Sequence, residues 1–177
     1  MDVRWRDQVL QTVWTSRLLL EPLRVEHAEE MVAVLADDSL YEFTGGSAPT
    51  IEQLTARYRR QVAGSDRDDE SWLNWIVRRI DTSQAAGFVQ ATVVGDAADV
   101  AWLVATTQQR QGVAREAAGM MLTWLASHGV SRCRAHIAPD HVASARVAEV
   151  LGLTRSGDTD DAGEEVWTGT APFPPPD

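Results

Sequence analysis

Apolar side chains recur at two different spacings along the chain, and the changes between these spacings predict an order of strands and helices. Residues 17–23 carry a short apolar run that ends near a proline, which predicts a first strand. In residues 26–36 the apolar positions lie three and four apart, as in an amphipathic helix. Thr50 and Gln53 have the spacing of a capping box and predict the start of a second helix that runs to about Val62.

The middle of the chain changes to a period of two. After a polar connection, residues 72–80 and 85–94 alternate between apolar and polar or small side chains, with a short polar turn between them. This pattern predicts an antiparallel hairpin. Gly95 and Asp96 then turn the chain into residues 100–105, a continuous apolar run that we expect to be a central strand buried on both faces.

The last third predicts a crossover and a second hairpin. Residues 112–128 carry a helical apolar stripe that stops at Gly129. Residues 132–137 predict a strand, residues 139–152 a helix, and the remainder two strands around Gly163. Early hairpins and a late strand-helix-strand unit together predict an α+β fold with a mixed, mostly antiparallel sheet.

Length and termini add to this picture. The chain has 177 residues, which is typical of one domain, and we expect that domain to span residues 1–170. Residues 171–177 are rich in proline, so we expect a frayed C-terminal tail. The longest apolar run is far too short to cross a bilayer. Because the first residues mix both charge signs and do not resemble a signal peptide, we expect a cytoplasmic protein.

Charge and cysteine usage exclude several classes of partner. Sixteen Lys and Arg face twenty-six Asp and Glu, and this net charge of -10 disfavours binding to a nucleic-acid backbone. Cys133 is the only cysteine, which excludes an internal disulfide and a cysteine-rich metal site. We therefore expect no nucleic acid, no membrane and no metal ion as a partner, and a monomer or a homodimer.

The segment that carries chemistry is the junction at residues 100–119. A strand passes through a polar loop into a helix that begins near Gly112, and such a helix start presents unpaired N–H groups and the positive end of the helix dipole. This arrangement suits a pyrophosphate, with Ala114 small enough to let it approach and Arg110 or Arg115 adding positive charge. The alternative is an ordinary helix start with solvated arginines.

Two motifs favour the first interpretation. QRQGVA at residues 109–114 resembles the Q/R-x-x-G-x-G/A acetyl-CoA signature of the GNAT superfamily of N-acetyltransferases. PDHVASARVAEVLGL at residues 139–153 resembles the second cofactor segment of that family, with Ser144 in its conserved place. Upstream, TSRLLLEPL, LYEFTGG and GFVQATV are similar to the branch that includes the ribosomal-protein N-terminal acetyltransferases. The likeness covers residues 15 to about 168.

This resemblance implies a sheet of about six or seven strands flanked by about four helices and splayed between its fourth and fifth strands. The arm of acetyl-CoA would lie in the gap between residues 99–105 and 132–137. Main-chain groups of the first strand would pair with the arm, and the amides after it would hold the pyrophosphate. The implied coenzyme contacts are Leu103, Val104, Gln109, Arg110, Gln111, Gly112, Val113, Ala114, Arg115, His141 and Ser144.

The sequence also departs from the family pattern. His141 stands where relatives usually have Asn, Thr106 where they often have Pro, and Arg110 where Gly is common. Ala148 occupies the position of a tyrosine that protonates the leaving thiolate in many relatives, so Ser144 or a water molecule would have to serve instead.

Catalytic and acceptor residues have competing interpretations. Asp99 corresponds to an acidic position in similar enzymes and is a candidate base or amine anchor; the alternative, which its place after the Gly95–Asp96 turn favours, is a solvated turn residue. Ser144 could bond near the coenzyme sulfur or only cap a helix, and His141 could be an exposed helix-start residue. The candidate acceptor-binding residues are Glu42, Phe43, Trp72 and Trp75.

The sequence therefore predicts an acetyl-CoA-dependent N-acetyltransferase that acts on a primary amine by direct transfer in a ternary complex. The acceptor would be a protein N-terminus or a small molecule. The rival hypothesis is a protein of the same fold that binds acyl-CoA without catalysis, since the tyrosine and the asparagine are both replaced.

Overall fold

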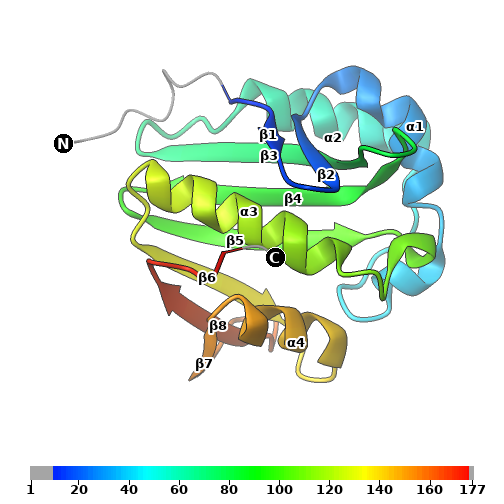
Figure 1. Ribbon diagram of the computed structural model, residues 1–177. Coiled ribbons are helices and arrows are strands. Elements are labelled where there is room, and N and C mark those ends of the chain that lie inside the picture. The colour runs from blue at the N-terminus through cyan, green and yellow to red at the C-terminus, as the bar shows by residue number, and fades with distance from the viewer. Residues whose placement is uncertain (1–9, 176–177) are drawn as a thin grey trace.

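One eight-stranded sheet runs through the computed structural model, which describes residues 10–175 (Figure 1). Its spatial order is β1-β2-β3-β4-β5-β6-β8-β7, and β5 with β6 is the parallel pair among otherwise antiparallel neighbours. The strands are β1 (Val13–Trp14), β2 (Leu18–Pro22), β3 (Glu70–Arg79), β4 (Ala85–Val94), β5 (Ala97–Val104), β6 (Arg132–Ile137), β7 (Thr154–Thr159) and β8 (Glu165–Thr170). The mixed, mostly antiparallel α+β architecture predicted from the sequence is confirmed.

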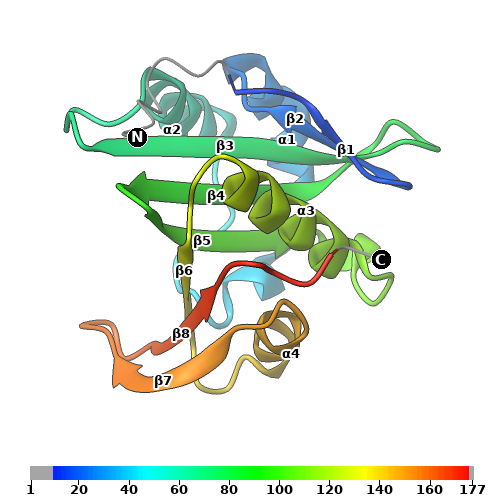
Figure 2. The same cartoon turned by 60° about the vertical axis from the view of Figure 1, so that its left-hand side comes forward.

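Four α-helices cover the two faces of the sheet within the described residues (Figures 1 and 2). They are α1 (Ala28–Val34), α2 (Ile51–Ala63), α3 (Val113–Ser127) and α4 (Val142–Val150). α3 and α4 close a large core on one face, and α1 and α2 close a smaller one on the other face around Met31, Leu54 and Ile76. The order of strands and helices follows the predicted one.

Local signals in the sequence set several element ends. At the start of α2 the amide of Gln53 donates to Thr50 Oγ1 at 3.3 Å, and the amide of Thr50 donates to Gln53 Oε1 at 3.0 Å, so the capping box is confirmed. Gly129, at φ +96°, follows the end of α3, where a left-handed residue satisfies the last carbonyl groups at little steric cost.

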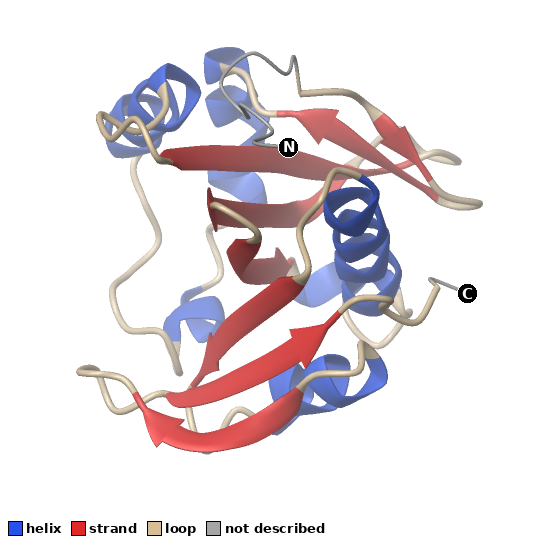
Figure 3. Ribbon diagram, turned by 90° about the vertical axis from the view of Figure 1, so that its left-hand side faces the viewer, coloured by secondary structure: helices blue, strands red, loops and turns tan. Residues whose placement is uncertain are grey.

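The sheet splays between β5 and β6. Their parallel pairing is limited to Ala97 with Arg132, Ala98 with Cys133 and Asp99 with Arg134. Beyond these pairs the two strands diverge, and Figure 2 shows β6 turned steeply away from β5. In Figure 3 the part formed by β6, β8, β7 and α4 lies below the strands β1 to β4. The predicted splay between residues 99–105 and 132–137 is therefore confirmed.

Two expectations about the sheet need correction. The sheet has eight strands instead of six or seven, because β1 is a two-residue strand too short to give a periodic signal. Residues 100–105 are not buried on both faces, because β5 loses its β6 neighbour after Asp99; Ala101 is exposed and Trp102 is half-buried.

The expected C-terminal tail is partly a core element. Phe173 is only 9% exposed and packs into the larger core, and the amide of Ala171 donates to Ser131 O at 2.9 Å. Residues 1–9 of the expected domain and 176–177 of the expected tail lie outside the described residues. Among the described helices, none has the length and apolar character needed to cross a membrane.

Candidate active site

The start of α3 forms a tight left-handed turn at the C-terminal end of β5. Gly112 caps the helix at φ +78°, and Arg110 has φ +61°, a conformation that costs a non-glycine residue energy. This backbone requirement explains why glycine is common at position 110 in the family that the sequence resembles. The side chain of Val113 is buried and that of Arg115 is exposed. The first-turn amides, which a helix leaves without internal partners, are therefore the groups that this turn offers to an anion.

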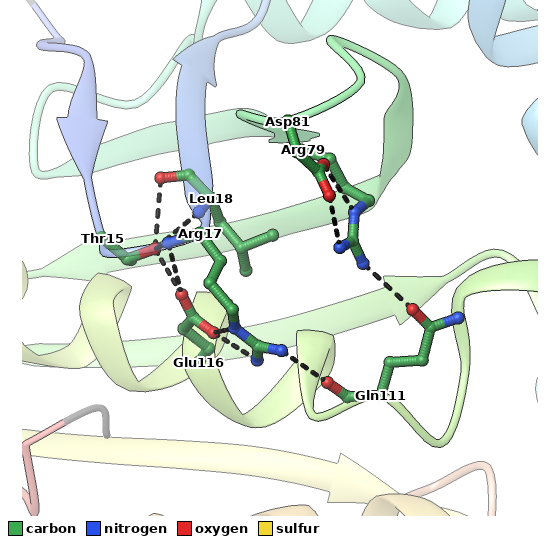
Figure 4. Close-up of polar contacts among 7 residues, drawn as sticks. All are labelled: Thr15, Arg17, Leu18, Arg79, Asp81, Gln111 and Glu116. Atoms are coloured by element: carbon green, nitrogen blue, oxygen red, sulfur yellow. Dashed lines mark hydrogen bonds and ion pairs between the residues drawn. The ribbon is translucent and has the colours of Figure 1, made fainter.

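A buried carboxylate fixes this turn from behind (Figure 4). Glu116, 2% exposed, accepts hydrogen bonds from Thr15 Oγ1 at 2.5 Å and from Arg17 Nε at 2.7 Å. Arg17 also donates to the carbonyl of Gln111 at 3.1 Å, and Arg79 donates to the side-chain oxygen of Gln111 at 3.0 Å. The exposed side chain of Gln111 is thus held by hydrogen bonds within the chain, which leaves its main-chain N–H for the expected role.

The main-chain groups of β5 alternate between its β4 edge and the gap on its β6 edge. A Cβ atom built at Gly87 of β4 would lie 2.0 Å from Leu103 O, so this carbonyl points to β4 and not into the gap. The carbonyl of Val104 accepts a hydrogen bond from Gln109 Nε2 at 3.0 Å. Backbone polar groups alternate between the two edges of a strand. The main-chain groups of Trp102 and the N–H of Val104 therefore face the β6 side. The Leu103 carbonyl is thus turned away from the gap, and the expected coenzyme contacts at Leu103 and Val104 stay predictions.

The start of α4 joins two expected site residues. His141 caps the helix, its Nδ1 accepting from the amide of Ser144 at 3.5 Å while its Nε2 lies 3.1 Å from Ser144 Oγ. The ring stacks on Phe43 with centroids 4.4 Å apart. Burial lowers the pKa of His141, against the opposing effect of the Glu42 carboxylate. Ala148 is fully buried, so this helix presents no tyrosine-like acid at that position.

The loop over residues 37–49 touches both sides of the splay. Asp37 accepts a hydrogen bond from Thr106 Oγ1 at 2.7 Å, in the connection that leaves β5. This bond, with a second one from Ser39, holds the pKa of Asp37 below its usual range. Through Phe43 the same loop reaches the start of α4. The loop therefore borders the gap in which the coenzyme arm is expected.

Asp99 lies at the closed end of the splay but is already paired. Arg134 of β6 donates to both of its carboxylate oxygens, at 2.7 and 3.0 Å. Two residues further along β6, His136 Nδ1 lies 2.9 Å from Asp160 Oδ2 and His136 Nε2 lies 3.9 Å from Asp99 Oδ1. Sequence reasoning missed His136 and Asp160. The alternation that buries Cys133 could have placed His136 with Arg134 on the open face.

The expected acceptor residues separate into two groups. Glu42 and Phe43 lie on the loop beside the gap. Trp72 is half-buried and donates to Glu70 at 2.9 Å. It lines a groove of about 260 Å³ beside α2, on the part of the sheet face that the helices leave open. The indole of Trp75 is instead 1% exposed and packs edge-on against Trp124 beneath α3, at 5.3 Å. Trp75 belongs to the core because alternation along β3 turns it to the opposite face from Trp72.

A smaller cavity of about 60 Å³ adjoins this groove beneath α2. The two spaces share Gln61, Asn74 and Gln90. Tyr58 lies in the small cavity, is 4% exposed, and its hydroxyl has no hydrogen-bond partner among the described residues. Burial raises the pKa of Tyr58, so the hydroxyl stays protonated at neutral pH.

One group of side chains in the described part of the chain has metal-like spacing. His136, Asp160 and Glu164 place one ligand atom each within 4.8 Å of the others. Internal hydrogen bonds account for this arrangement, since Asp160 Oδ1 accepts the amides of Ala162 and Glu164 at 2.9 Å. These bonds, with that of His136, hold the pKa of Asp160 below its usual range.

Comparisons with known proteins agree on one family. Residues 17–154 match the sequence profile of the acetyltransferase (GNAT) domain. A GNAT-family acetyltransferase from Bacillus anthracis superposes with a TM-score of 0.77 at 18% identity, covering 90% of this chain and 98% of the other. A Vibrio cholerae protein assigned as a ribosomal-protein-serine acetyltransferase gives a TM-score of 0.73 at 17% identity, covering 90% and 97%.

A third structure was solved with bound coenzyme. RimL, a ribosomal L7/L12 alpha-N-protein acetyltransferase in complex with coenzyme A, gives a TM-score of 0.71 at 12% identity, covering 90% of this chain and 98% of the other. A search of curated protein sequences gives no significant match. At such low identities the structural likenesses show the fold, and the sequence profile shows the family.

Proposed function

Because the chain belongs to the GNAT acetyltransferase domain family, we propose that it is an N-acetyltransferase that transfers the acetyl group of acetyl-CoA to a primary amine. One observation carries the proposal: the left-handed Gly112 that starts α3 lies at the end of β5, the strand from which β6 diverges after Asp99. An anion seat thus adjoins a gap in the sheet. The first-turn amides and the helix dipole suit the pyrophosphate, and the gap suits the arm that follows it.

The acetyl group would lie along the free edge of β5. Trp102 and the N–H of Val104 face this gap, and an N–H there stabilises the oxyanion of the tetrahedral intermediate. The amine nitrogen attacks the thioester carbon, the C–N bond forms and the C–S bond breaks. The reaction needs a neutral amine and a proton for the departing thiolate.

Ser144 is the proposed donor to the thiolate. The amide of Ser144 donates to His141 Nδ1, so the neutral ring carries its proton on Nε2, 3.1 Å from Ser144 Oγ. The serine oxygen then accepts from His141, and its own O–H is free to point at sulfur. This pair would take the place of the tyrosine that many relatives have where this chain has Ala148.

The acceptor would approach over the open sheet face beside α2. The groove there is lined by Arg60, Gln61, Trp72, Asn74, Gln90, Ala91 and Thr92, a mixed polar surface that can hydrogen-bond a peptide backbone. A protein N-terminus is supported by the ribosomal-protein acetyltransferases among the similar structures. A small amine is the alternative acceptor, and the cytoplasm is the proposed compartment.

Thiol release tests the proposal directly. Purified protein with acetyl-CoA is offered short peptides with free α-amino groups and primary alkylamines, and free thiol is measured with and without acceptor. Acceptor-dependent release with an acetylated product by mass spectrometry supports the enzyme. Tight coenzyme binding by calorimetry without acceptor-dependent release supports the non-catalytic rival.

A serine variant tests the proposed proton donor. Ser144→Ala should lower kcat about 10- to 100-fold with coenzyme affinity nearly unchanged, because the hydroxyl acts on the departing thiolate. Ser156→Ala, on the exposed edge strand β7, is the control and should keep full activity. An unchanged kcat for Ser144→Ala would remove Ser144 from the mechanism.

A further inference from the structure

We propose that His136, oriented by Asp160, is the general base that takes the proton from the acceptor amine. This inference rests on the proposed function, because it assigns a residue to that reaction. Asp99, the base expected from the sequence, is less suited to the role. Both of its oxygens accept from Arg134, so protonating Asp99 would break a bidentate ion pair.

The position of His136 follows from the register of the sheet. Arg134 is the last β6 residue paired with β5, and His136 lies two residues further on, about 7 Å along the strand. Cys133 and Ala135 point into the core, so Arg134 and His136 point to the opposite face. His136 therefore stands just inside the splay, on the face where the acceptor groove lies.

The coenzyme arm leads to the same place. Its pyrophosphate seat is at the C-terminal end of β5, and the gap narrows from there toward Asp99 and Arg134. The acetyl end of an arm lying in this gap would therefore be the part nearest the closed end. An amine that attacks from the open face would come within reach of His136.

Asp160 sets the tautomer of the imidazole. Its Oδ1 accepts the amides of Ala162 and Glu164, and its Oδ2 lies 2.9 Å from His136 Nδ1. An ionised carboxylate in this position makes Nδ1 the protonated nitrogen and leaves a lone pair on Nε2. Nε2 lies 3.9 Å from Asp99 Oδ1, beyond hydrogen-bond distance. Asp160 is thus a positioning residue, and it also stabilises the imidazolium that forms.

The proton balance is complete with these groups. An ammonium acceptor gives one proton to His136 Nε2, and the resulting neutral amine attacks the thioester carbon. The second proton leaves the nitrogen as the amide forms, passing to water. The thiolate takes the Ser144 proton, and the serine recovers a proton from this water. His136 returns its proton to solvent, so the products are the N-acetyl amine, coenzyme A and one released proton. The charged and titratable groups around His136 are Asp99 on β5, Arg134 on β6, and Asp160 and Glu164 in the β7–β8 turn.

A pH profile separates catalysis from structure. With the best acceptor peptide from the thiol-release panel, His136→Gln should lower kcat/KM at pH 7 about 100-fold and abolish the limb that falls toward acid pH. Asp160→Asn should also lower kcat/KM at pH 7, by a smaller factor than His136→Gln, because the imidazole loses the carboxylate that fixes its tautomer. Coenzyme affinity should change less than about threefold in both variants.

Controls distinguish failure of the role of His136 from failure of the proposed function. His128→Gln, at the end of α3 on the other face, should leave the rate and the profile unchanged. If the wild-type protein is active and His136→Gln keeps its rate and its acidic limb, the role of His136 is refuted while the proposed function stands. If the wild-type protein acetylates no acceptor, both proposals fall. The wild-type rate is measured with and without EDTA, and all variants are assayed with EDTA. Loss of the wild-type rate on EDTA addition would also overturn the proposal.

Discussion

Arg17, in the turn between β1 and β2, is bound to Glu116, in the first turn of α3, although 99 residues separate them in the chain. The guanidinium lies 2.5 Å from the carboxylate at its shortest contact, and the side chain of Glu116 is 3% exposed while that of Arg17 is 48% exposed. Arg17 also donates to the Gln111 carbonyl, so one buried charge ties the first strands to the turn that precedes α3.

Glu116→Gln should destabilise the protein by about 2 to 3 kcal/mol. Breaking a buried pair costs about 3–5 kcal/mol, and the half-exposed Arg17 recovers part of this from water. Urea denaturation monitored by tryptophan fluorescence measures the change. Asp69→Asn is the control, because the Arg67–Asp69 pair is about 60% exposed on both sides and should cost less than about 1 kcal/mol. Equal stability of Glu116→Gln and wild type would show that the network does not support the fold.

Spacing along the chain was sufficient to predict most elements. The bounds of β4 and β6 agree with the predicted strands because each is a regular run between turn signals. The start of α2 follows from a capping box, which is a contact between residues three apart. The left-handed turn at Gly112 before α3 is also local. These features could be predicted because short-range geometry determines them.

Contacts between distant segments could not be predicted in this way. Nothing in the spacing of Glu116 indicates that Arg17 will reach it, or that Asp160 will orient His136. Strand periodicity also leaves open which face meets which helices, so Trp75 could not be assigned to the core beneath α3. These relations depend on sheet order and register, which become fixed only when the whole chain packs.

Substitutions at Gly112 should separate backbone strain from anion binding. Gly112→Ala places a side chain at φ +78°, with Cβ 3.3 Å from Arg17, and should cost about 1–2 kcal/mol of stability. Gly112→Asp carries the same strain and adds a negative charge at the seat, so it should also weaken acetyl-CoA binding about 100-fold or more in a calorimetric titration.

Gly163 provides the matched control for that series. It has φ +82° with nothing within 4 Å of an added Cβ, in the turn between β7 and β8. Gly163→Ala should lose similar stability without a change in coenzyme affinity. Coenzyme binding by Gly112→Asp at the wild-type level would place the pyrophosphate elsewhere.

Stability should fall as the pH drops from about 7 toward 5, and His27 should contribute to the fall. His27 is 4% exposed, and burial lowers its pKa despite the nearby Glu21 carboxylate. Between the ordinary value of about 6.5 and the lower folded value, the unfolded chain binds the proton and the folded chain does not. The free energy of unfolding is therefore complete above the unfolded pKa and decreases below it, by at most about 1.4 kcal/mol per pH unit for one group.

His27→Gln tests this assignment. Urea denaturation at pH 7.5, 6.5 and 5.5 should give a smaller slope for the variant than for wild type. A residual slope is expected, because burial also lowers the pKa of His141. Carboxylates such as Glu21, whose pKa is lowered, lose their contribution only at more acidic pH. The same slope in both proteins would exclude His27 as a source.

Tyr58→Phe should make the protein more stable by about 1 kcal/mol. The hydroxyl is buried without a partner among the described residues, and an unsatisfied polar group of this kind costs about 1–3 kcal/mol. Tyr41→Phe is the control of opposite sign: the Tyr41 hydroxyl donates to Leu35 O at 2.9 Å, so its loss should destabilise by about 1 kcal/mol. If both variants lose stability alike, the Tyr58 hydroxyl is satisfied in solution. If Tyr58→Phe is more stable and also raises the KM for the acceptor amine, the hydroxyl serves binding at the expense of folding, as expected for a polar group in a cavity that adjoins the acceptor groove.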